Sequence, residues 1–159
     1  MLSRKHLHAI WEKTKSDDIE DMPPEDQRIS GIMREHQSEF FNQFEFADLT
    51  YDHEYDPDTE VNPFLHIAIH TIIESQLENR DPPAAVQFYN AMRKRKYSHH
   101  DAIHILGAVL APLLSGTLQK KGAFDTERYT ALLKKYKNHH PEKILDLLED
   151  EPLLKGIFP

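Results

Sequence analysis

Two pairs of histidines form the pattern in this sequence that points most directly to chemistry. His66 and His70 are four residues apart, and so are His100 and His104. In an α-helix, residues at positions i and i+4 stand on one face, about one turn apart. Each pair can therefore direct two imidazole nitrogens toward one metal ion, as in helical zinc sites.

Carboxylates lie near both pairs in the sequence. Glu74 is one turn beyond His70. Asp101 lies three positions before His104 and is a candidate hydrogen-bond partner that would orient a ligating imidazole. Two such helices that crossed would offer four imidazoles and one carboxylate to a metal. The predicted ligands are His66, His70, Glu74, His100 and His104. A set rich in imidazole suits zinc, iron, nickel or copper rather than calcium or magnesium, and no motif for a nucleotide or an organic cofactor is present.

The spacing leaves two interpretations open. Random placement of 11 histidines in 159 residues gives about 0.7 pairs at i, i+4, and the chain has two. Each ring could instead be a core histidine bonded to a carbonyl or a carboxylate, because an unpaired polar ring in an apolar helix is costly. His36, which lies on an apolar stripe beside Glu35, could join a metal site, but we favour its interpretation as a core residue. No pairing of a base with a nucleophile accompanies the histidines, so catalysis stays open, with Glu74 as the only obvious base.

The elements that must position these residues are helices. Most of the chain has apolar residues at a period of 3.6, which predicts a single all-α domain of six or seven helices over residues 1–159. The clearest helix spans 62–77, with Asn62 as its cap and Pro63 in its first turn. It is apolar on nearly every side, which predicts a buried, central helix. The second histidine pair lies in a second apolar helix, 99 to about 114, which Pro112 should kink or end early, leaving 116–122 as a loop.

Five further helices are expected around these two, at 3–15, at about 23–40, at 83–96, at 125–137 and at 141–148. We expect residues 42–61 to be ordered, with their aromatic side chains packed on the helices and with at most one short helical turn. The last nine residues, 151–159, are expected to pack as an extended tail or a turn.

Composition and charge exclude several classes of protein. The chain has no cysteine, so disulfide frameworks and thiolate metal sites are excluded. Its net charge is −8, and residues 17–61 carry 15 acids against two arginines, which argues against nucleic-acid binding. The longest nearly apolar run, 103–114, is too short to cross a membrane, which takes about 20 residues. With no apolar signal core after the N-terminus, we expect a soluble, cytoplasmic protein.

A different function class fits the same charges. The chain could be a helical interaction module with structural histidines, and its acidic segment 42–61 would then dock a protein partner or another copy of the chain. Convergence of the four imidazoles would favour the metal site, whereas separate carbonyl partners for each ring would favour the interaction module.

The string Asn62-Pro63-Phe64-Leu65-His66 is the most specific signature in the sequence. His70, Glu74, Asp81-Pro82 and the His100-x-Ala102-x-His104 pattern follow it. With them the chain resembles a bacterial family of unknown function, domain-of-unknown-function family 1841, over about residues 11–110 and most strongly over 62–104. The resemblance implies a small helical protein whose histidines belong to its signature, with a further histidine near position 36, and it implies no activity. Ile103 and Pro112 stand where the family tends to carry acids, so a site in this chain must depend on imidazoles.

Overall fold

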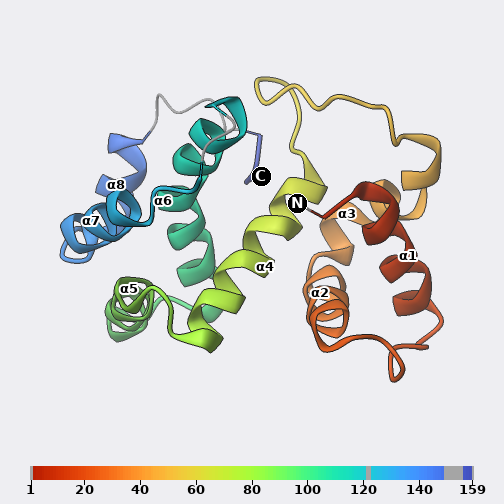
Figure 1. The fold of residues 1–159 in the computed structure, drawn as a ribbon, viewed down its shortest axis with the longest axis horizontal. Coiled ribbons are helices and arrows are strands. Elements are labelled where there is room, and N and C mark those ends of the chain that lie inside the picture. The colour runs from red at the N-terminus through yellow and green to blue at the C-terminus, as the bar shows by residue number, and fades with distance from the viewer. Residues whose placement is uncertain (1, 121–122, 149–155, 159) are drawn as a thin grey trace.

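The structure, a computed structural model, describes residues 2–120, 123–148 and 156–158, with the backbone alone for 115–120 (Figure 1). Within these ranges the chain folds into α-helices and one short 3-10 helix, with no strand, which confirms the all-α class. The described part of the chain contains eight α-helices, one more than the upper expectation. They are α1 (Arg4–Lys15), α2 (Pro24–Glu35), α3 (Gln37–Glu45), η1 (Ala47–Leu49), α4 (Pro63–Asn79), α5 (Pro83–Lys94), α6 (His99–Lys120), α7 (Thr126–Tyr136) and α8 (Pro141–Leu147).

Helix α4 is the central helix of the fold. It crosses the middle of the molecule, between α1–α3 on one side and α5–α8 on the other (Figure 1). Its start is fixed as the sequence predicts, because the Asn62 side chain accepts hydrogen bonds from the amides of Phe64 and Leu65, both at 3.1 Å. All of its residues from 63 to 73 except Leu65 and Ile72 are buried, which confirms the expected central position.

Two hydrophobic clusters share α4. Phe64 and Ile67 belong to the cluster formed with α1–α3. Ile69 and Ile73 belong to the cluster formed with α5–α8. Since α4 contributes to both, the histidines that it carries are placed where the two clusters meet.

The expected helix at 23–40 is two helices, separated at His36. This residue has a non-helical backbone (φ −102°, ψ 5°) and is at once the C-cap of α2 and the N-cap of α3. Both α2 and α3 pack on α1, and α2 packs on α4 as well. The break leaves the His36 side chain at the end of a helix, facing α4.

Pro112 does not end α6 early, which was one of the two outcomes expected for it. The helix continues to Lys120, so residues 116–120 are helical rather than a loop, and residues 121–122 lie outside the described residues. The turns around the proline are deeply buried, with Ala108, Leu110 and Ala111 at 0% exposure. Packing on several sides offsets the single backbone hydrogen bond that proline removes.

The acidic segment is ordered, but only part of its apolar surface is buried. Phe44 is fully buried, but Phe46 is 53% exposed, contrary to the expectation that the aromatic side chains pack on the helices, and Leu49 is 77% exposed. The Arg4 guanidinium holds the segment from α1 by donating to the carbonyls of Thr50, at 3.0 Å, and Tyr51, at 3.2 Å.

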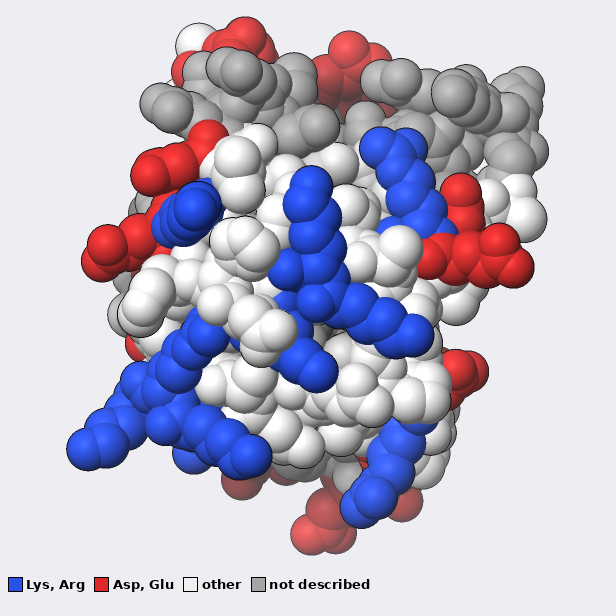
Figure 2. Space-filling model, turned by 90° about the vertical axis from the view of Figure 1, so that its left-hand side faces the viewer, with Lys and Arg blue, Asp and Glu red and all other residues white. Residues whose placement is uncertain are grey.

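Positive charge gathers on one face of the molecule. Lys and Arg side chains gather on the face formed by α5 and α7 (Figure 2), where both helices end in basic residues. Such cations interact favourably with the carboxyl ends of helices. None of the described helices combines the length and the apolar character needed to cross a membrane.

Candidate metal centre

Five imidazole rings meet at the centre of the molecule. α4 contributes His66 and His70, α6 contributes His100 and His104, and the α2–α3 junction contributes His36. The four-residue spacing places each helical pair on one face, as predicted. Of the five, His36, His66 and His70 are at most 2% exposed.

The rings are close enough for their nitrogens to share one ion. One ring nitrogen from each of His36, His70, His100 and His104 can be chosen so that all four lie within 4.8 Å of one another. Nitrogen ligands of a tetrahedral zinc ion lie about 3.3 Å apart, so closing this group takes a movement of less than about 1 Å per ring. His66 lies directly beside the group, with its ring centroid 4.6 Å from that of His36 and 4.8 Å from that of His70.

Backbone carbonyls fix which nitrogen is free on two of the rings. His36 Nδ1 is 2.8 Å from the carbonyl oxygen of Ile32, and His66 Nδ1 is 2.6 Å from that of Ile157. A carbonyl can only accept, so Nδ1 carries the proton on both rings and Nε2 presents a lone pair. This is the arrangement by which proteins orient metal-binding histidines from behind.

Four buried nitrogens in the cluster lack a hydrogen-bond partner. They are the Nε2 atoms of His36, His66, His70 and His104. Leaving a buried polar atom unsatisfied costs about 1–3 kcal/mol, and here several such atoms converge on one place. Separate carbonyl partners, the alternative considered for the sequence, account for Nδ1 of two rings but not for these four nitrogens.

Burial keeps the central imidazoles neutral. It lowers the pKa of His66 to about 4 and that of His104 to about 3, with neighbouring histidines adding to the shift. The pKa of His70 is lowered further, again chiefly by burial and then by the other imidazoles around it. Neutral imidazole is the form that binds metal, so these nitrogens are available as ligands at neutral pH.

The two carboxylates of the predicted site lie differently from the histidines. Glu74 Oε1 pairs with His99 Nε2 at 2.6 Å and is not among the convergent ligand atoms. Asp101 is exposed, and its amide donates to the Ser98 side chain at the start of α6. Its charge raises the pKa of His104, but by less than burial and the neighbouring histidines lower it. The structure therefore brings together the four predicted histidines without the predicted carboxylate.

His36 is the site residue that sequence reasoning set aside. The interpretation as a core histidine is half right, because its Nδ1 does bond to a carbonyl, but its Nε2 faces the other rings. The available signals were its place on the apolar stripe and the matching histidine in the resembling family. Neither indicates that the helix breaks at this position.

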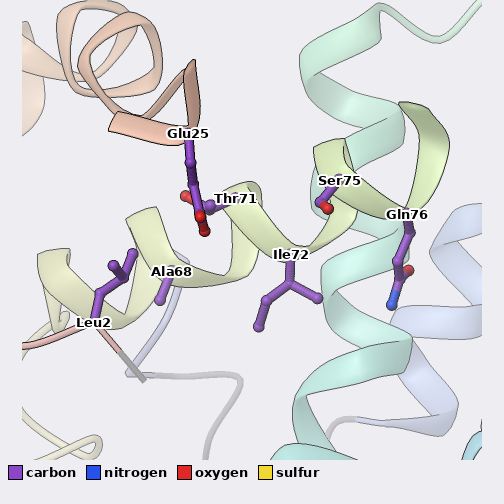
Figure 3. A pocket seen from close by; sticks show the side chains of 7 residues that line it. All are labelled: Leu2, Glu25, Ala68, Thr71, Ile72, Ser75 and Gln76. Atoms are coloured by element: carbon purple, nitrogen blue, oxygen red, sulfur yellow. The ribbon is translucent and has the colours of Figure 1, made fainter. Parts of the chain in front are cut away.

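None of the clustered histidines lines the pocket beside α4 that Figure 3 shows. That pocket, of about 560 Å³, is lined by Leu2, Glu25, Ala68, Thr71, Ile72, Ser75 and Gln76. A binding pocket usually combines an apolar wall with groups of perturbed pKa. The imidazoles with lowered pKa values do not line this pocket. The pocket is therefore not part of the candidate metal site.

Together the fold and the site define an all-helical protein with a buried cluster of histidines. The chain belongs to the family described as a domain of unknown function, DUF1841, because the model of that family matches residues 2–135. All five clustered histidines lie inside the matched range. No curated protein and no solved structure shows significant similarity to the chain.

Proposed function

We propose that this protein binds a transition-metal ion, with zinc as the first candidate and iron and nickel as the others, through His36, His70, His100 and His104. The observation that carries the proposal is the convergence of four imidazole nitrogens within 4.8 Å at a buried point. Imidazole binds all three metals, and a set of imidazole nitrogens does not favour the hard cations calcium or magnesium.

His66 lies beside these four ligands and is the candidate for a fifth, although its nitrogen is not one of the four that converge. Its free Nε2 is buried and unsatisfied, and its ring is 5.0 Å from that of His104. The four convergent nitrogens alone suit a tetrahedral zinc ion, whereas a fifth nitrogen would suit nickel or iron, which accept more than four ligands. Glu74, the base considered for catalysis, is held by His99. The proposal is therefore metal binding, without an assigned reaction.

The test uses protein purified without a histidine tag. Elemental analysis should find about one metal ion per chain, and zinc added to metal-free protein should raise the melting temperature. At a free concentration 1,000 times the dissociation constant, zinc stabilises the folded state by about 4 kcal/mol. His70→Gln and His104→Gln should weaken zinc binding at least about 100-fold, since each removes one ligand.

The matched control is His140→Gln, because His140 is exposed at the start of α8, far along the chain from the cluster. It should bind zinc as the wild type does. If zinc, nickel, copper and ferrous iron all leave the melting curve of the metal-free protein unchanged, the proposal is wrong.

The interaction module is a second candidate that one observation favours. Phe46 and Leu49 are exposed within the acidic segment, and Phe41 just before it is 48% exposed. Apolar side chains exposed together mark interaction surfaces. The basic face of α5 and α7 in Figure 2 has the opposite charge, so we propose that this segment docks on that face of another copy of the chain.

This association should depend on salt, because charges across an exposed interface are screened at high ionic strength. Sedimentation at low salt should show a species larger than the monomer, which dissociates at about 1 M salt or in Leu49→Ser. A wild type that stays monomeric at low salt and at millimolar concentration would remove this candidate and leave the metal site untouched.

A further inference from the structure

The C-terminal residues Gly156, Ile157 and Phe158 lie against the histidine cluster. The Gly156 carbonyl accepts a hydrogen bond from the Asn62 amide at 2.7 Å, at the start of α4. Ile157 is 1% exposed and belongs to the hydrophobic cluster of α4–α8. These residues, called here the C-terminal strap, are thus held at both the backbone and the side chain.

Two glycines make room for the strap. A Cβ added at Gly156 would lie 2.6 Å from Pro57 Cβ, and one added at Gly107 would lie 2.7 Å from Phe158 Cζ. Real Cβ atoms essentially never come so close, so either substitution forces a shift. Gly107 is one turn beyond His104 on α6, and its missing side chain lets the Phe158 ring approach the cluster.

The strap contacts the cluster through two groups. The Ile157 carbonyl oxygen is the partner of His66 Nδ1 at 2.6 Å, which leaves the His66 Nε2 free to face the other rings. The Phe158 ring has its centroid 4.7 Å from that of His104 and 5.4 Å from that of His66. One group therefore sets the tautomer and orientation of an imidazole, and the other covers two imidazoles with apolar surface.

The strap lies outside the matched family range, which ends at residue 135. The histidines of the cluster and the strap that covers them thus come from different parts of the chain with respect to the family. Asn62 links the matched region to the strap, because its side chain caps α4 and its backbone N–H donates to the Gly156 carbonyl.

We infer that the C-terminal strap is a positioning and covering element of the metal site, with Ile157 orienting His66 and Phe158 limiting access to the ion. This inference rests on the metal binding proposed above. A carbonyl behind a ligating imidazole strengthens metal binding, and an apolar cover slows entry of water and chelators. Loss of the strap should therefore speed release of the ion and alter its ligand environment.

The experiment compares zinc release to an excess of a chromophoric chelator and the visible spectrum of cobalt(II) bound in place of zinc. Phe158→Ala and a chain ending at residue 155 should release zinc at least about tenfold faster than the wild type and should change the cobalt bands, which report ligand number and geometry. Phe158→Leu keeps an apolar cover and should behave much like the wild type.

Leu132→Ala is the control for a merely structural effect. Leu132 packs on the same hydrophobic cluster from α7, a helix that carries none of the five clustered histidines. It should lower the melting temperature and leave the release rate and the cobalt spectrum unchanged. If zinc binds to the wild type but release and spectrum are the same in Phe158→Ala and in the truncated chain, the role of the strap is refuted and the metal site stands. If the wild type binds neither zinc nor cobalt, the proposed metal site and this inference both fail.

Discussion

Acidification should destabilise the metal-free protein because its central histidines are neutral when folded. The pKa of His66 is about 4 and that of His104 about 3, and the pKa of His70 is also lowered. In the unfolded chain the same side chains titrate near 6.5. Below that pH the unfolded chain binds protons that the folded protein does not, so the stability is fully present above about 6.5 and is lost as the pH falls toward the folded values.

The size of the effect follows from the same values. At pH 5.5 the folded imidazoles are still neutral, and each unfolded imidazole gains about 1.4 kcal/mol from protonation relative to pH 7.5. Three such histidines sum to about 4 kcal/mol. That is a large share of the 5–15 kcal/mol that typically separates folded from unfolded domains.

Urea unfolding in the presence of a chelator measures this directly, at pH 7.5, 6.5 and 5.5. His104→Gln should reduce the loss between pH 7.5 and 5.5 by about 1.4 kcal/mol, whatever it does to the absolute stability. His140→Gln, the exposed control, should leave the loss as it is in the wild type. A free energy of unfolding that stays constant or rises on acidification would show that the clustered imidazoles are hydrated or paired with acids, and the physical basis of the shared site would be lost.

Three further predictions concern the elements that hold the site. Ile69→Asp should prevent folding, because residue 69 is only 1% exposed and the change would bury an unpaired charge. Ile69→Val should lower the free energy of unfolding by only about 0.5–1.5 kcal/mol. If circular dichroism shows that the Asp variant folds, Ile69 does not belong to the core. Asn62→Ala should lower the free energy of unfolding, measured in urea, by about 1 kcal/mol, because it removes the two hydrogen bonds that cap α4. Asn62→Asp keeps a side-chain acceptor and should retain most of that stability. An equal loss of stability in both variants would contradict the capping role of Asn62. Tyr129→Phe should lower the free energy of unfolding by about 1–2 kcal/mol, because the Tyr129 hydroxyl donates a hydrogen bond to Gln76 Oε1 at 2.8 Å. The hydroxyl is buried, which also raises its pKa. An unchanged urea midpoint would show that this hydrogen bond does not stabilise the fold.

Local rules account for the parts of the fold that depend on neighbouring residues. The start of α4 follows from an asparagine before a proline, and both are where the sequence predicts them. The helical period alone places both histidines of a pair on one face of their helix, so His66 and His70 share a face whatever the rest of the chain does. Local rules failed at Pro112, where the cost of one lost hydrogen bond is outweighed by burial that the sequence does not reveal.

The composition of the site, by contrast, was decided by packing between helices. Glu74 has the right spacing to follow His70, yet it pairs with His99 of a different helix. His36 joins the cluster because the chain breaks between α2 and α3 and because α2 packs on α4. Ile157 meets His66 across a separation of 91 positions.

Sequence periodicity therefore determined which side chains each helix would present together, and it determined two of the three parts of the histidine cluster. Only the tertiary structure decided which presented faces would meet, and so which histidine would complete the group and which carboxylate would be left out. The physical reason is that a helical face is set by backbone geometry within a few residues. The contact between two faces is set by the free energy of burying apolar surface over the whole chain.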